Sequence, residues 1–214
     1  MEKTKSGIFI LFFLIFNALN VSAQSVHDVV FVPCQEMPKL INNYYADYRS
    51  LSIAYRVDTS PETRARFEKL NNNYLEALDE LNFESLPLEC QVDYILFSRD
   101  LKENIRLSKI QQENFENVKE WFPFADRIYD VERIRRKGGE INAKKLALEL
   151  DDINDRVKEL QEALKTEKDL ELISIYTSEE IIDDLRGALE SVYNFYNGYD
   201  PLFSWWIPVP YKNL

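Results

Sequence analysis

The spacing of apolar residues restricts the fold of this chain more than any other feature of its sequence. Between residues 143 and 164, apolar positions alternate in steps of three and four; they are Ala143, Leu146, Leu150, Ile153, Val157, Leu160 and Leu164. Because an α-helix has about 3.6 residues per turn, all seven side chains fall on one helical face. This heptad seam of three repeats fits antiparallel packing in a bundle better than an intermolecular coiled coil.

Five further segments show the same helical period and have recognisable ends. They are residues 38–57, 61–81, 87–117, 124–137 and 177–198. Ser60 before Pro61 is a typical helix start, Thr177 with Glu180 forms a predicted capping box, and Gly198 is a predicted helix stop. The chain contains only 5 glycines and no convincing strand pattern. We therefore predict an all-α fold, a helical bundle of about six helices over residues 38–198 with an aromatic, proline-rich C-terminal segment over residues 199–214.

The first 23 residues have the order of a signal peptide. Lys3 and Lys5 precede an apolar run at residues 8–16, and Val21-Ser22-Ala23 stands before Gln24. The run is shorter than the roughly 20 residues that span a bilayer, so an uncleaved membrane anchor is the weaker alternative. We expect cleavage before Gln24, export to the periplasm or the extracellular space, no membrane attachment afterwards, and an extended lead-in over residues 24–37.

Export would place the two cysteines, Cys34 and Cys90, in an oxidising compartment. A disulfide between them is one possibility, and two buried free thiols are the other, because the sequence does not give the Cα separation. With His27, the only histidine, they offer three donors without the short spacing of a zinc site. We expect no metal and no cofactor in this chain.

Charge and residue content exclude several classes of function. The formal net charge of -11 opposes nucleic-acid binding, which depends on lysine and arginine displacing counterions. A single histidine rules out a His-Glu-x-x-His zinc motif and leaves His27 as the only imidazole base for a nucleophilic triad. A hydrolase that uses paired carboxylates is a third, weaker hypothesis, since the acids lie on outward helix faces. We identify no catalytic residue in the chain.

Basic residues crowd the last turns of the helix predicted at 124–137; they are Arg133, Arg135, Arg136 and Lys137. Cations at this end complement the negative end of the helix dipole, which is the explanation we favour. An anion-binding patch is the alternative.

The end of the chain is unusually aromatic. Residues 195–211 contain seven aromatic side chains and three prolines. Such side chains carry large apolar areas, so the segment either forms a ligand platform, folds back on the bundle, or docks against polypeptide absent from this sequence. The candidate partner or substrate-cleft surface consists of Tyr199, Asp200, Phe203, Trp205, Trp206 and Tyr211.

Three segments, in this order, resemble the N-terminal half of the bacterial domain-of-unknown-function family numbered 885. They are Val92-Asp93-Tyr94-Ile95-Leu96 with Arg99-Asp100-Leu101, then Phe122-Pro123-Phe124-Ala125-Asp126, then Tyr196-Asn197-Gly198-Tyr199-Asp200-Pro201 with Trp205-Trp206 and Pro210-Tyr211. The resemblance covers nearly the whole mature chain. Members of that family are longer, resemble helical zinc-dependent peptidases of the gluzincin type, and carry a histidine-rich metal motif in their C-terminal half.

The resemblance implies that this chain is the non-catalytic helical portion of an exported peptidase, with zinc held by the full-length relatives. No position here matches a metal or catalytic residue of the family, so the chain alone is expected to be inactive. Residues 199–214 would lead into a missing C-terminal domain and would contact that domain or a peptide substrate. The alternative is a freestanding periplasmic helical binding or scaffold module that holds a partner at Trp205 and Trp206.

Overall fold

The computed structural model describes residues 33–166 and 170–214, and these residues form an all-α structure. They contain eight α-helices and no strand, which confirms the predicted fold class. The predicted signal peptide at residues 1–23, His27 and most of the predicted lead-in lie outside the described residues. No helix in the described part of the chain is both long enough and apolar enough to cross a membrane.

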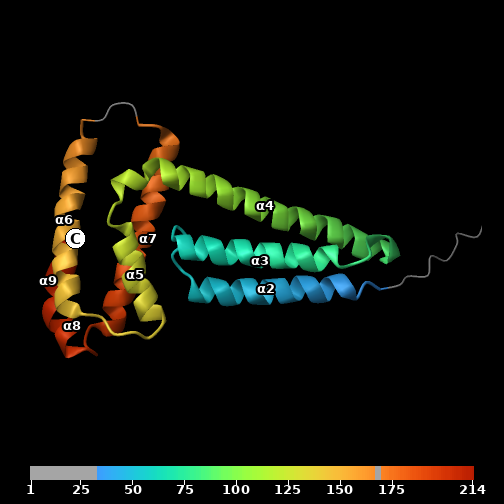
Figure 1. The fold of residues 1–214 in the computed structure, drawn as a ribbon, viewed down its shortest axis with the longest axis horizontal. Coiled ribbons are helices and arrows are strands. Elements are labelled where there is room, and N and C mark those ends of the chain that lie inside the picture. The colour runs from blue at the N-terminus through green and yellow to red at the C-terminus, as the bar shows by residue number, and fades with distance from the viewer. Residues whose placement is uncertain (1–32, 167–169) are drawn as a thin grey trace, which may run out of the picture. The chain divides into compact units, whose positions relative to one another are not determined.

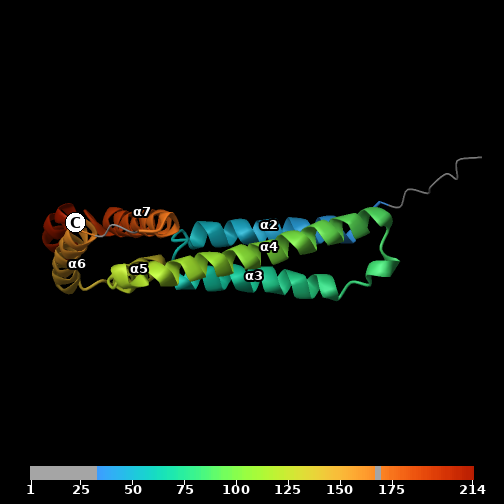
Figure 2. The same ribbon diagram turned by 90° about the horizontal axis from the view of Figure 1, so that it is seen from above.

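Helices α2 (Glu36–Ala54), α3 (Pro61–Asp79) and α4 (Leu88–Val118) pack together, and each contacts the other two. Figures 1 and 2 show α2 and α3 side by side with α4 lying across them. A short 3-10 turn, η2 (Phe83–Ser85), precedes α4. The side chains that form this first core are Met37, Tyr44, Leu70, Leu78, Cys90, Phe97 and Leu101.

The ends of these helices follow local sequence signals. The Ser60 side chain accepts a hydrogen bond from the Thr63 backbone N–H at 3.2 Å, and Pro61 occupies the first turn, as predicted. Helix α2 begins at Glu36, two residues before the predicted start at Pro38. Proline is tolerated there because the amides of the first turn have no partner within the helix. The helical bundle therefore includes the last two residues of the predicted lead-in.

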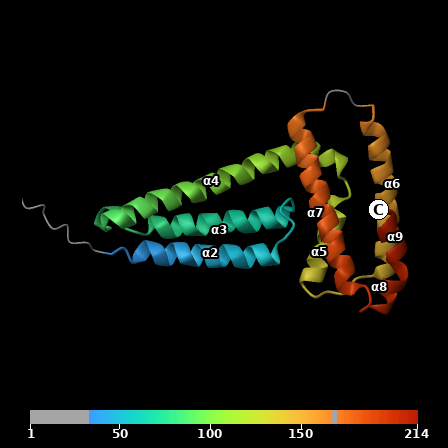
Figure 3. The same ribbon diagram turned by 180° about the vertical axis from the view of Figure 1, so that it is seen from behind.

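The second core is built from α5 (Ala125–Arg136), α6 (Ala143–Leu164), α7 (Leu172–Tyr196) and the end of α4. In Figure 3, α7 lies beside α5, and α6 lies beside α8 (Pro201–Trp206) and α9 (Pro208–Asn213). The N-terminal half of the heptad seam is buried here, since Leu146, Leu150 and Ile153 belong to this core. These seam residues therefore pack inside the bundle.

Helix α4 belongs to both cores. Phe97 and Leu101 are buried in the first core, whereas Phe115 and Val118 are buried in the second. Between Leu101 and Phe115 no residue of α4 is buried. A single helix therefore connects the two cores through a largely solvated stretch, and the turn η3 (Lys119–Trp121) follows it.

The predicted capping box at Thr177 and Glu180 is wrong. Helix α7 starts at Leu172, so Thr177 lies inside the helix and is buried. Four large apolar side chains in its first turns, Leu172, Ile173, Ile175 and Tyr176, are exposed. The helical period of buried residues becomes visible only after them, which placed the predicted start too late.

Candidate functional site

The C-terminal segment folds into the short helices α8 and α9. Gly198 has a φ of +86°, a value that favours glycine, and the backbone turns there out of α7. The Asp200 carboxylate then caps α8 by accepting from the backbone N–H groups of Leu202 and Phe203 at 2.8 and 3.1 Å. Asp200 therefore has a structural role at a helix start, a role that the sequence analysis did not assign to it. Pro201 and Pro208 each occupy the first turn of a helix, where proline is tolerated.

One face of this segment packs into the second core. Phe203 is 0% exposed and Ile207 is also buried, while Tyr211 is half-buried and stacks on Tyr193 of α7 at 4.2 Å between ring centroids. The prediction that Phe203 lies on a surface is therefore wrong, because its ring fills the core between α6 and α7. The segment folds back on the bundle, which was one of the three alternatives.

The opposite face is exposed and apolar. Trp205 is 79% exposed and Tyr199 is 83% exposed, and Trp206 keeps 39% of its surface exposed. The residues Leu202, Trp205, Trp206 and Val209 are spaced by three, one and three positions, as on one side of a helix. We call this set, with Tyr199, the C-terminal aromatic surface. Lys144 approaches this surface, with its Nζ 5.5 Å from the centroid of the Trp206 ring.

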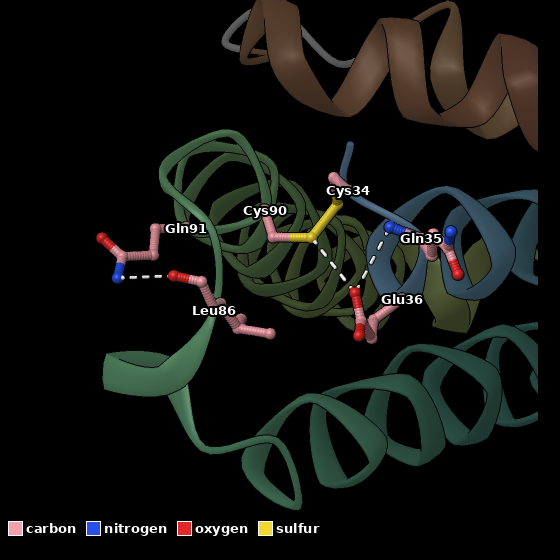
Figure 4. The surroundings of a disulfide bond; sticks show 6 residues. All are labelled: Cys34, Gln35, Glu36, Leu86, Cys90 and Gln91. Carbon is pink, nitrogen blue, oxygen red and sulfur yellow. Dashed lines mark hydrogen bonds between the residues drawn. A yellow bond between two sulfur atoms is a disulfide. The ribbon is translucent and has the colours of Figure 1, made fainter. Parts of the chain in front are cut away.

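The two cysteines form a disulfide that ties the residues before α2 to the first turn of α4. The Cα atoms of Cys34 and Cys90 are 5.2 Å apart, and Cys90 is fully buried in the first core. Figure 4 shows the Glu36 carboxylate pointing toward this bond, with Oε2 3.6 Å from Cys90 Sγ. A disulfide sulfur has no proton to donate, so this is a contact and not a hydrogen bond.

Cys34, Glu36 and Cys90 form a group of metal-type donors in the described residues. Metal ions bind cysteine as the thiolate. In the disulfide both sulfur atoms are bonded to each other, so neither is a thiolate. The disulfide is therefore a covalent link between the residues before α2 and the first turn of α4.

The basic residues of α5 are engaged by acids of this chain. The pairs are Arg133–Asp130 at 2.7 Å, Arg135–Glu132 at 2.8 Å and Arg136–Glu62 at 2.6 Å. The last of these pairs joins α5 to α3, and the Arg136 guanidinium also lies 4.2 Å from the Tyr55 ring centroid. These pairs neutralise the arginines, so an anion-binding patch is not favoured there.

Three carboxylates meet where the α2–α3 loop approaches α7. Asp184 accepts a hydrogen bond from the Thr59 backbone N–H at 2.6 Å. Partial desolvation, and then the charge of Asp184, raise the pKa of the Asp58 carboxyl; desolvation, and then Asp184 and Asp58, raise the pKa of Glu180. No nucleophile or base is hydrogen-bonded to Asp58 or Glu180 within the described residues, so the cluster gives no support to the carboxylate hydrolase hypothesis.

Replacing one of these carboxylates is expected to stabilise the protein at neutral pH. A raised pKa in the folded state means that stability falls as pH rises from the ordinary carboxyl pKa through the raised one. Asp58→Asn should therefore raise the Tm at pH 7, by an amount worth less than about 1 kcal/mol because Asp58 is exposed. The gain should vanish at about pH 3, below the ordinary pKa of aspartate. Thermal unfolding at both pH values measures this, with exposed Asp151→Asn on α6 as the control; an equal gain at both pH values would contradict it.

A polar network in the first core was missed by the sequence analysis. The Tyr44 hydroxyl donates to Asn71 Oδ1 at 2.9 Å and accepts from Asn104 Nδ2 at 3.2 Å. No local motif could reveal this network, because its three members come from three different helices.

Comparisons with protein-family models, with curated proteins and with solved structures give no match to the chain. The resemblance to family 885 therefore stays a proposal that depends on the three quoted segments. Function has to be inferred from the residues of the chain and their geometry.

Proposed function

We propose that this chain is the N-terminal, non-catalytic helical portion of an exported zinc-dependent peptidase, and that the catalytic portion packs on the C-terminal aromatic surface. The observation that carries the proposal is the exposed apolar face of α8 and α9. An exposed tryptophan and its apolar neighbours at helical spacing are typical of surfaces that another polypeptide covers.

The residues of this chain do not fit a peptidase zinc site. Such a site takes two histidines from one helix together with a glutamate base, and the chain has only His27. Zinc and the general base would therefore come from residues beyond this sequence. The role of the present chain would be to support the catalytic portion and to shape one wall of its cleft.

The coding DNA tests the proposal directly. Reading through and beyond codon 214 should show an open frame that encodes a histidine-rich metal motif. A stop codon immediately after Leu214 would overturn the proposal. It would favour the alternative of a freestanding binding or scaffold module, for which the C-terminal aromatic surface would be the partner site.

Association of the two portions tests the surface itself. With the downstream portion expressed as a separate chain, Trp205→Ser should weaken binding by at least about tenfold, because buried tryptophans dominate interface energies. Ile53→Ser is the matched control, since Ile53 is an exposed apolar residue on α2 beside the other core. Equal affinity of Trp205→Ser and the wild-type chain, measured by calorimetry, would place the interface elsewhere.

A further inference from the structure

A groove of about 420 Å³ lies between α2 and α4 in the first core. These two helices contact each other, and Figure 2 shows α4 crossing α2. The volume falls within the roughly 300–1,000 Å³ of small-molecule sites. Six of the eight residues that line the groove are aromatic or acidic; they are Tyr44, Tyr45, Tyr48, Phe97, Asp100 and Glu103.

The four aromatic rings form a floor and a rim. Tyr44 and Phe97 are 4% and 5% exposed, and their ring centroids lie 5.2 Å apart at an interplanar angle of 73°. Tyr45 and Tyr48 are exposed, and their ring centroids lie 5.4 and 6.0 Å from that of Tyr44. Several rings around one space can hold an organic ammonium ion, because the face of each ring is electrically negative.

The rings of this groove carry no cation from the described part of the chain. Five arginine or lysine side chains lie over aromatic rings there, and those rings belong to Tyr55, Phe115, Phe195 and Trp206. None of these four residues lines the groove. A cation that enters the groove would therefore not have to displace one of these side chains from a ring.

The two charged side chains that line the groove, Asp100 and Glu103, are both acidic. Each pairs with an arginine outside the lining, Asp100 with Arg99 at 2.9 Å and Glu103 with Arg106 at 2.6 Å. These four side chains are between 47% and 69% exposed, and ion pairs at such exposure are weak. Both carboxylates therefore remain able to attract a cation into the groove.

The floor of the groove favours a cation that has no N–H group. The Tyr44 hydroxyl is already engaged, because it donates to Asn71 and accepts from Asn104. Phe97 offers no hydrogen-bond acceptor at all. A primary ammonium would have to give up hydrogen bonds to water at this floor, whereas a quaternary ammonium has none to lose and packs its methyl groups against the rings.

We propose that the groove between α2 and α4 binds a small quaternary ammonium compound. Its methyl groups would lie against the rings of Tyr44, Tyr45 and Tyr48, and the carboxylates of Asp100 and Glu103 would attract its charge. The inference goes beyond the proposed function and does not rest on it, because the groove belongs to the first core and the C-terminal aromatic surface to the second.

Choline is the probe for this site. Its matched control is 3,3-dimethyl-1-butanol, which has the same shape without the positive charge. In an NMR titration of the full chain at constant ionic strength, choline should shift the ring signals of Tyr44, Tyr45 and Tyr48. The neutral alcohol should bind at least about tenfold more weakly, because it lacks both the cation–π and the Coulomb attraction.

Two variants separate the contributions of the rings and of the acids. Tyr45→Leu should weaken choline binding by about fivefold, and Asp100→Asn by about threefold. Exposed residues elsewhere serve as matched controls, since Tyr176→Leu on α7 and Asp151→Asn on α6 should leave the affinity unchanged. All four replaced side chains are exposed, so the variants should keep the helical circular dichroism of the wild type.

Three outcomes would overturn the inference. The first is that choline leaves the three tyrosine ring signals of the wild-type chain unmoved. The second is that the neutral alcohol shifts them at the same concentrations as choline, because the groove would then be only an apolar hollow. The third is that Tyr45→Leu and Asp100→Asn both bind choline as tightly as the wild type, which would place the bound cation elsewhere.

Discussion

Reduction of the Cys34–Cys90 disulfide is expected to lower the free energy of unfolding by about 4 kcal/mol. The bond closes a loop with a sequence separation of 56 residues, and opening it restores chain entropy to the unfolded state. That loss is large beside the roughly 5–15 kcal/mol that stabilises a typical domain. Urea unfolding with and without a phosphine reductant measures it, and the Cys34→Ala/Cys90→Ala variant should show a similar loss.

The tryptophans make this experiment more informative. All three, Trp121, Trp205 and Trp206, belong to or flank the second core, whereas the disulfide staples the first. Because α4 is shared, we expect tryptophan fluorescence and circular dichroism to report the same lowered midpoint. If reduction leaves the free energy of unfolding within about 0.5 kcal/mol of the oxidised value, the entropic argument for this staple is refuted.

Phe203→Ala is expected to destabilise the protein by about 3–5 kcal/mol, whereas Trp205→Ala should change the stability by less than about 0.5 kcal/mol. The two aromatic residues are neighbours on one short helix, but Phe203 is fully buried and Trp205 is mostly exposed. Removing the Phe203 ring leaves a cavity between α8 and α7. Removing the Trp205 indole creates no buried cavity, because water fills the space that it leaves.

The comparison of these two variants by urea unfolding tests how the C-terminal segment is held. Trp205→Ala also serves as the control for losing an aromatic side chain from α8. A cost below about 1 kcal/mol for Phe203→Ala would mean that the segment does not depend on this core contact.

Helix positions were predictable where a cap or a break is encoded by neighbouring residues. Ser60 with Pro61, Pro87, and Gly198 with its φ of +86° marked real helix boundaries. The start of α7 was not predictable, because its first turns carry exposed apolar residues that look like part of an irregular segment. Helices α8 and α9 were missed because their prolines suggested a broken chain, although proline is accepted in a first turn.

The candidate surface was only partly predictable for a similar reason. Aromatic density in residues 195–211 indicated an important segment, but composition does not tell which side of a helix faces the core. Once α8 is recognised as a helix, spacing separates the buried side chains from the exposed ones, because Phe203 and Ile207 lie four residues apart on the buried side. The asparagine pair was beyond reach, since Asn71 and Asn104 meet only through the tertiary packing of α3 and α4.

The solvated stretch of α4 sets the rotational phase between the two cores. Each residue of an α-helix turns the chain by about 100° and advances it by about 1.5 Å. Inserting one residue between Leu101 and Phe115 would therefore rotate the second core about the axis of α4 relative to the first core. Inserting four residues would return it close to its original orientation. Asn104 in this stretch hydrogen-bonds Tyr44, but no side chain of the stretch is buried, so the number of residues in it constrains the fold more than their identity does.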